Sequence, residues 1–255
     1  MTITVDGANL IALLLASVRI VAWLSIVPPF ASGGIPVMGK VVLSVGLALA
    51  VAPTLAAGKV PQTTPELLLS AGMQVAVGAA MGFVTMLLFS AVASAGSLID
   101  VFGGFALAAA YDPLSLNSNA VFGRFNQMLA VVLMMVSGGY LLVIGGLLAS
   151  FRFVGLTGMP TVHHWPDIFT TAFSMCFTIA VQLALPLIAV LFVVDLALAL
   201  MTKVAPQLNA MNVMFPAKVG LTLLLVGLCF PMLPSATDHL VSLANQAMAS
   251  LVGAG

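Results

Sequence analysis

The chain has 255 residues, of which 62% are hydrophobic and 5% are charged, with seven basic and seven acidic side chains. Soluble domains carry about 25% charged residues, so this composition excludes a water-soluble globular protein. A net charge of zero argues against the basic surface that binds nucleic acid. The mean hydropathy of +1.24 and the continuous, non-alternating apolar runs predict an all-α polytopic membrane protein.

Six hydrophobic segments are expected, because one membrane-spanning helix needs about 20 apolar residues. In chain order they cover residues 8–27, 41–57, 67–110, 125–149, 168–201 and 219–233. We take them together as a single membrane domain over residues 1–255. Asp6 is the only charge before Arg19, and without a basic region at this point we expect no cleaved signal peptide.

Two of these segments are too long for a simple crossing. Residues 67–110 are about twice as long as one span, so this segment either projects from the bilayer as one long helix or folds back as a hairpin. Gly96, Gly103 and Gly104 favour a broken helix that bends at the glycines. In the segment 168–201, Pro186 predicts a kink because proline has no N–H to donate.

Two polar stretches interrupt the apolar pattern. Residues 111–121 (YDPLSLNSNAV) are the most polar stretch and predict a loop. Residues 202–218 are polar and bounded by prolines, and they precede the last span. Beyond Pro234 the chain is amphipathic, with polar residues among leucines and alanines: Asp238, His239, Asn245 and Gln246.

Three charged residues lie within apolar segments: Arg19, Asp100 and Asp195. A charge at the centre of a bilayer costs about 2.5–3.5 kcal/mol on insertion scales, so these side chains must face protein or water. One interpretation is a path for ions or protons. The other is a set of ion pairs between helices or between subunits, and the sequence leaves both open.

Small residues in the spans predict close packing between helices, because glycine lets two backbones approach. The glycines concerned are Gly72, Gly78, Gly82, Gly138, Gly139, Gly145 and Gly146.

No catalytic motif of a metalloprotease, an esterase or a nucleotide-binding loop occurs, so we expect no enzyme and no cofactor. His163, His164 and Asp167 carry metal-ligand chemistry. Adjacent histidines in a loop point in different directions, however, and we expect no metal site there.

The C-terminal part of the chain carries a recognisable signature. Residues 195–200 (DLALAL) are followed by residues 203–209 (KVAPQLN) and 215–218 (FPAK). This pattern resembles the FliR family of flagellar type III export-apparatus membrane proteins, close kin of the injectisome SctT-type proteins. By this resemblance, the signature residues with expected contacts to other subunits are Asp195, Lys203, Pro206, Gln207, Leu208, Asn209, Pro216 and Lys218.

Two other stretches support the resemblance, which covers about Ala8 to Pro234. One looks like the family's glycine-rich helix that runs into an Asp-Pro loop, and the other looks like its N-terminal hairpin. The glycine-rich helix and its loop comprise residues 96–100 (GSLID), 103–105 (GGF) and 111–113 (YDP). The N-terminal hairpin comprises Arg19, residues 28–30 (PPF), residues 35–36 (IP) and Lys40. The chain departs from the family at residues 137–140 (SGGY), where members often show Asn-Gly-His.

The resemblance implies a non-enzymatic subunit of a staggered helical assembly in the bacterial inner membrane, at the flagellar basal body. FliP-like, FliQ-like and FlhB-like subunits would be its partners, and unfolded flagellar proteins would pass through the export gate that they form. The Asp-Pro loop would lie at the pore axis as a plug, although an ordinary solvated turn is the alternative. The plug residues would be Tyr111, Asp112, Pro113, Leu114, Ser115, Leu116, Asn117, Ser118 and Asn119.

Two alternatives to a flagellar gate subunit remain at this point. The chain is an injectisome export-apparatus subunit, or it is a stand-alone secondary transporter, which broken helices and buried charges also permit. The transporter hypothesis differs in that it requires no partner subunits.

Overall fold

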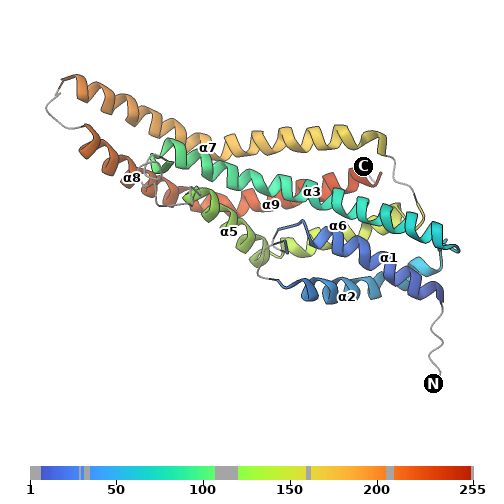
Figure 1. Ribbon diagram of the computed structural model, residues 1–255. Helices are drawn as coiled ribbons and strands as arrows, with labels where there is room; N and C mark the ends of the chain where they lie inside the picture. Colours follow the sequence, from blue (N-terminus) through green and yellow to red (C-terminus); the bar gives the residue numbers. More distant parts are fainter. Residues whose placement is uncertain are drawn as a thin grey trace. The chain divides into compact units, whose positions relative to one another are not determined.

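The computed structural model describes residues 7–28, 30–31, 35–106, 120–158, 162–204 and 210–253. The regular structure of these residues is helical (Figure 1). The helices are α1 (Gly7–Leu24), α2 (Val37–Ala56), α3 (Thr64–Phe102), α5 (Val121–Val136), α6 (Gly139–Phe153), α7 (Trp165–Val204), α8 (Ala210–Cys229) and α9 (Leu233–Leu251), with 3-10 turns at Val162–His164 and Phe230–Met232. The predicted all-α fold is confirmed.

Several of these helices are suited to a bilayer. Within the described residues, five helical stretches are long and apolar enough to cross a membrane: α1, α2, α3, α7 and Pro216–Leu251. A sixth results when α5 and α6 are counted as one broken span. The prediction of a polytopic membrane protein with broken helices is therefore confirmed.

The chain divides into two compact units. Unit 1 contains Met1–Leu88, Gly138–Phe173 and His239–Gly255, and unit 2 contains Phe89–Ser137 and Ser174–Asp238. Helices α3, α7 and α9 each contribute to both units. Each unit has its own buried core.

In unit 1, the core joins α1, α2 and the segment after α6. Ala12, Leu15, Ala52 and Leu156 form a buried cluster. Helix α3 packs closely on α1, since a Cβ at Gly78 would collide with the carbonyl oxygen of Arg19. These contacts confirm the close helix packing predicted at Gly78.

The other predicted small-residue contacts divide into two classes. A Cβ at Gly82 would lie 3.1 Å from Ile26 Cβ, and one at Gly146 would collide with Asn245 Oδ1, so both glycines serve close packing. By contrast, a Cβ at Gly72 or Gly145 would meet nothing within 4 Å. Close packing within the chain is therefore confirmed at Gly78, Gly82 and Gly146, and Gly72 and Gly145 make no such contact within the chain.

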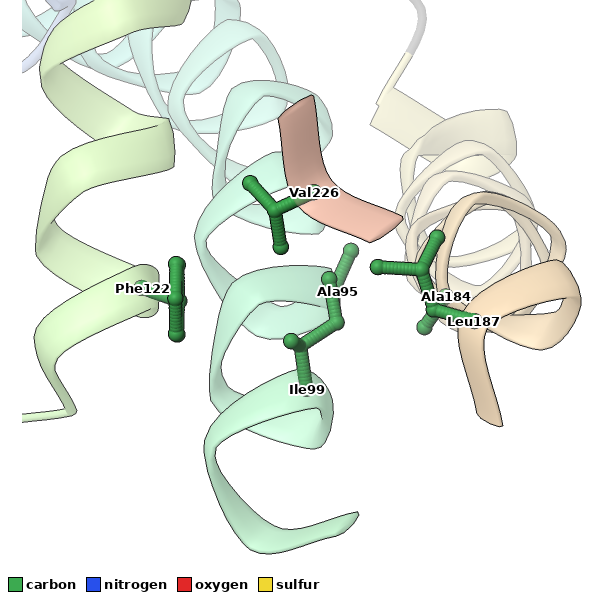
Figure 2. Close-up of a cluster of buried hydrophobic side chains, with 6 residues drawn as sticks. All are labelled: Ala95, Ile99, Phe122, Ala184, Leu187 and Val226. Carbon is green, nitrogen blue, oxygen red and sulfur yellow. The ribbon is translucent and has the colours of Figure 1, made fainter. Parts of the chain in front are cut away.

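Unit 2 is held by a cluster of apolar side chains from α3, α5, α7 and α8. Figure 2 shows these side chains gathered between the four helices. The cluster comprises Ala95, Ile99, Phe122, Ala184, Leu187 and Val226.

One predicted bend is absent. Helix α3 continues without a break through Gly96 and ends at Phe102, before Gly103 and Gly104. The helix ends before the two glycines as predicted, and Gly104 has a φ of +86°, which L-residues with side chains rarely adopt. Gly96 serves a different purpose, namely close contact with the start of α5.

One predicted span is interrupted. The segment expected at residues 125–149 consists of α5 and α6, with a break at Ser137 and Gly138. The physical reason is the φ of +78° at Gly138, which is incompatible with a continuous right-handed helix.

The polar stretch 202–218 is more helical than expected. Helix α7 continues through Pro186, where the sequence predicts a kink, and ends at Val204. Helix α8 begins at Ala210 and contains Pro216 within it. Apolar residues on both sides of the polar stretch extend the two helices into it.

Candidate functional site

The predicted site residues divide into those that the structure describes and those that it does not. The proposed plug, Tyr111 to Asn119, lies outside the described residues, as does the signature stretch Pro206 to Asn209. Arg19 lies in unit 1. Asp100, Asp195 and Lys218 lie in unit 2, together with Lys203 and Pro216, which are exposed.

Asp100 caps α5, a helix that begins at Val121 and is distant from Asp100 in the chain. Its side chain is 3% exposed. The two carboxylate oxygens accept hydrogen bonds from the Phe122 N–H at 3.1 and 3.0 Å, and Oδ2 also accepts one from the Gly123 N–H at 3.1 Å. These amides lie in the first turn of α5, where a helix leaves its N–H groups unpaired.

The start of α5 needs this external acceptor because its own N-cap residue cannot supply one. Ala120 occupies the N-cap position and makes no side-chain cap. A carboxylate at a helix N-terminus also meets the positive end of the helix dipole. The same hydrogen bonds therefore stabilise the buried carboxylate of Asp100 and give the N–H groups at the start of α5 an acceptor.

Close packing brings the two helices within reach of this contact. A Cβ at Gly96 of α3 would collide with the Phe122 carbonyl oxygen, and a Cβ at Gly123 of α5 would lie 2.6 Å from Ser97 Oγ. A side chain at either glycine would push α5 away from Asp100. These two glycines explain why α3 and α5 approach so closely at this point.

Both ends of the segment 107–119 are held in unit 2. Phe105, just before it, packs edge-on against Phe122, just after it, with ring centroids 4.9 Å apart. A Cβ at Gly103 would lie 2.9 Å from Thr222 Cγ2 of α8. The described residues that flank the predicted plug thus contact one another directly.

Arg19 is fully buried in unit 1 and is satisfied by neutral oxygens. Its Nε donates to Gln74 Oε1 at 2.6 Å, Nη1 donates to Ser150 Oγ at 3.0 Å, and Nη2 donates to the Val154 carbonyl at 2.8 Å. The guanidinium also lies 4.1 Å from the centroid of the Phe151 ring, an attractive cation–π arrangement. These contacts join α1, α3 and the end of α6.

Gln74 extends this network and was not singled out from the sequence. It is fully buried, and its Nε2 donates to the carbonyls of Gly155 at 3.2 Å and Leu156 at 3.1 Å. Gln74 thus orients Arg19 and fixes the segment that follows α6. An amide within the long apolar helix α3 was the signal for such a role, because a buried amide needs hydrogen-bond partners.

Asp195 pairs with Lys218 inside the chain. The Lys218 Nζ lies 2.7 Å from Asp195 Oδ1 and 2.8 Å from Oδ2, which ties α7 to α8. The side chains are 17% exposed for Lys218 and 37% for Asp195. The pair links the two helices on either side of the stretch 205–209, and the open side of Asp195 leaves room for another polar group.

These arrangements hold helices and helix ends together. In the part of the chain that the structure describes, no group of three or more His, Cys, Asp or Glu side chains is placed to hold a metal ion. Arg19, Asp100 and the Asp195–Lys218 pair each join elements that are distant in sequence. The three charged residues that lie within apolar segments, Arg19, Asp100 and Asp195, therefore have partners within the chain.

Comparisons with known proteins give a consistent result. The family of bacterial export proteins, family 1, matches residues 10–244. The flagellar biosynthetic protein FliR of Escherichia coli K12 is 31% identical over 234 residues, which are 92% of this chain and 90% of that protein. FliR of Bacillus subtilis 168 is 26% identical over 244 residues, 94% of each. The Yop proteins translocation protein T of Yersinia pestis is 29% identical over 178 residues, 69% of this chain and 68% of its own.

Proposed function

Because this chain belongs to the family of bacterial export proteins that includes FliR, and is thus a membrane subunit of a type III export apparatus, we propose that it helps to form the flagellar export gate. In this proposal it joins FliP-like and FliQ-like subunits, with an FlhB-like subunit beside them, in the bacterial inner membrane at the flagellar basal body. The gate is the channel through which unfolded flagellar proteins leave the cytoplasm. The chain has no enzymatic role in it.

The observation that carries the proposal is the extent of the match to flagellar relatives. It covers 92% of this chain and 90% of the Escherichia coli FliR. The match to the Yersinia protein covers about two thirds of each chain, which favours the flagellar system over the injectisome. The exposed apolar side chains on α7 and α8, such as Leu200 and Leu228 at 66% and 69% exposure, suit lipid or neighbouring subunits.

The experiment that tests this proposal identifies the partners. The tagged chain is expressed at its natural level in its host, extracted gently from the membrane, and analysed by mass spectrometry. Recovery of FliP-like and FliQ-like proteins in one large particle is the expected result, and the companion proteins then decide between a flagellum and an injectisome. A small, stable particle without partners would refute the proposal and favour a stand-alone transporter.

We further propose that residues 111–119 form the plug of this gate. The support comes from their flanks, where the Asp100 carboxylate and the Phe105–Phe122 contact hold the two ends of the segment together. A segment of small polar residues between two fixed ends can give way to a passing chain without disturbing a packed core.

Deletion of Leu114 to Ser118 tests the plug. We expect the assembled complex to be recovered as before while the membrane becomes leaky to small ions, measured as potassium efflux from cells. A matched control removes residues from an exposed turn outside unit 2, namely Gly58 and Lys59. If the deletion variant exports normally and holds potassium as the parent does, the segment is an ordinary turn.

A further inference from the structure

Helix α9 differs from the other long helices in what its exposed surface carries. From Ser235 onward, every exposed residue of α9 is polar: Ser235, Asp238, His239, Ser242, Gln246 and Ser250. The spacing of three to four residues places His239, Ser242, Gln246 and Ser250 along one face. All four belong to unit 1.

The opposite side of α9 is apolar and faces protein. Leu240, Val241, Ala244 and Met248 are at most 1% exposed. Gly146 of α6 lies against Asn245 and Met248. The end of the helix is tied to α7, because Trp165 Nε1 donates to the Leu251 carbonyl at 3.1 Å.

Other helices of unit 1 show the reverse surface. On α2, Val42 and Leu49 are 65% and 59% exposed, and on α6 Leu141 and Leu142 are each 60% exposed. Such surfaces suit acyl chains or apolar helices. Among the described residues, α9 carries none of the exposed large apolar side chains.

The exposed side chains are polar on α9 from Ser235 onward and chiefly apolar on α2 and α6, and this difference indicates which solvent surrounds α9. An amphipathic helix that buries its apolar side in protein and exposes its polar side is the pattern of a helix in water. The arrangement also differs from that of an interfacial membrane helix, whose apolar side enters the lipid. Charged and amide side chains turned toward hydrocarbon are costly, and Asp238 and Gln246 would both incur that cost.

We infer that the exposed face of α9 meets water, so that residues 239–250 lie outside the hydrocarbon region, although α9 belongs to a stretch long and apolar enough to cross a membrane. The apolar character of that stretch comes chiefly from α8, where Leu223, Leu224 and Leu228 are exposed. This inference does not depend on the flagellar assignment. It gives α9 a hydrated surface, which fits a water-filled space and does not fit lipid.

Site-specific labelling tests the inference in membranes that contain the full chain in its host assembly. Single variants Ser242→Cys and Gln246→Cys are treated with a charged maleimide after the vesicles have been opened so that both aqueous sides are reached. Because the reactive thiolate forms only where water is available, labelling reports hydration. Peptide mass spectrometry reads each site separately, so that the native Cys176 and Cys229 do not interfere.

Matched controls are Leu49→Cys and Leu142→Cys, which are also exposed and lie in the same unit, but on helices whose exposed side chains are chiefly apolar. We expect the two α9 sites to be labelled at least about tenfold faster than the two control sites. Labelling of both α9 sites as slow as that of the controls would overturn the inference.

A second measurement covers the case in which a cysteine variant is poorly recovered. The double variant Ser242→Lys and Gln246→Lys should be recovered from the membrane at the level of the parent, because water solvates the lysine ammonium group. The double variant Leu49→Lys and Leu142→Lys should be recovered at a small fraction of that level. Equal losses in both double variants would contradict a hydrated α9.

Discussion

Arg19 in unit 1 and Asp100 in unit 2 solve the same physical problem with opposite charges. Arg19 donates to Ser150 in the last turn of α6 and to the Val154 carbonyl at its end. Asp100 accepts from the first amides of α5. A helix carries partial positive charge at its N-terminus and partial negative charge at its C-terminus, so each buried charge meets the complementary end.

The two sites differ in how many parts of the chain depend on them. Arg19 is held through Gln74, which itself bonds to Gly155 and Leu156, so its network joins three helices through side chains. Asp100 bonds only to the backbone of one helix start. A capping side chain at the start of α5 can replace Asp100, whereas the network around Arg19 requires the guanidinium. The comparison teaches that a buried charge within a membrane protein does not require a counter-ion when helix ends are available.

The largest effect is expected for Arg19→Met. The change leaves buried acceptors of Gln74 and Val154 without a donor, at about 1–3 kcal/mol for each. We expect the free energy of unfolding to fall by about 3 kcal/mol or more. The measurement is the temperature at which the detergent-solubilised chain stops being monodisperse, which should be lower in the variant. Arg152→Met removes an exposed arginine in the same unit and should change little. Equal loss in both variants would show that charge in general, and not the buried network, stabilises unit 1.

A smaller effect is expected for Asp100→Ala, about 1–3 kcal/mol, which is the value of a helix cap made by charged hydrogen bonds. The double variant Asp100→Ala with Ala120→Asp restores a local cap on α5 but not the link to α3. We expect this double variant to regain part of the lost thermal stability. Full recovery would show that Asp100 acts only as a cap, and no recovery would show that the link between the helices is its entire contribution.

The smallest effect is expected for the partly exposed pair of Asp195 and Lys218. Removing one charge, as in Asp195→Asn, should cost no more than about 1 kcal/mol in the isolated chain. Exchanging the charges in Asp195→Lys with Lys218→Asp should restore the pair and the stability of the isolated chain. If export or recovery of the assembled complex stays impaired in the exchanged variant, Asp195 also contacts a group outside this chain.

The fold was predictable from the sequence to the level of helices and their lengths. Apolar runs separated by polar or proline-rich stretches are strong signals, and α1, α2 and α7 lie where the sequence predicts them. The sequence does not predict the break at Gly138, because Gly138 and Gly139 are equally compatible with close helix packing. At Gly96 the sequence predicts a bend, whereas in the structure this glycine allows close contact with α5. A glycine in an apolar segment can serve a bend or a close contact, and only the neighbouring helix decides which.

The candidate site was predictable only in part. The sequence identifies Arg19, Asp100 and Asp195 as charges that need partners, because their apolar surroundings are evident. It does not identify the partners, since most of them are backbone groups that every residue possesses. One local clue exists for Asp100: Ala120 cannot cap α5, so the cap had to come from elsewhere in the chain. The role of Gln74 depends on the path of the segment after α6, which no sequence pattern specifies.

The discontinuity of unit 1 has a consequence for how the protein is made. Its parts come from the first 88 residues, from the middle of the chain and from residues after 238. The contact between Trp165 and the Leu251 carbonyl forms only after α9 has left the ribosome. Proteins usually fold from the N-terminal end during synthesis. Here the contacts of α9 with Gly146 of α6 and Trp165 of α7 cannot form until the last helix is synthesised, so a chain released early by the ribosome would leave this part of unit 1 uncovered and accessible to quality-control proteases.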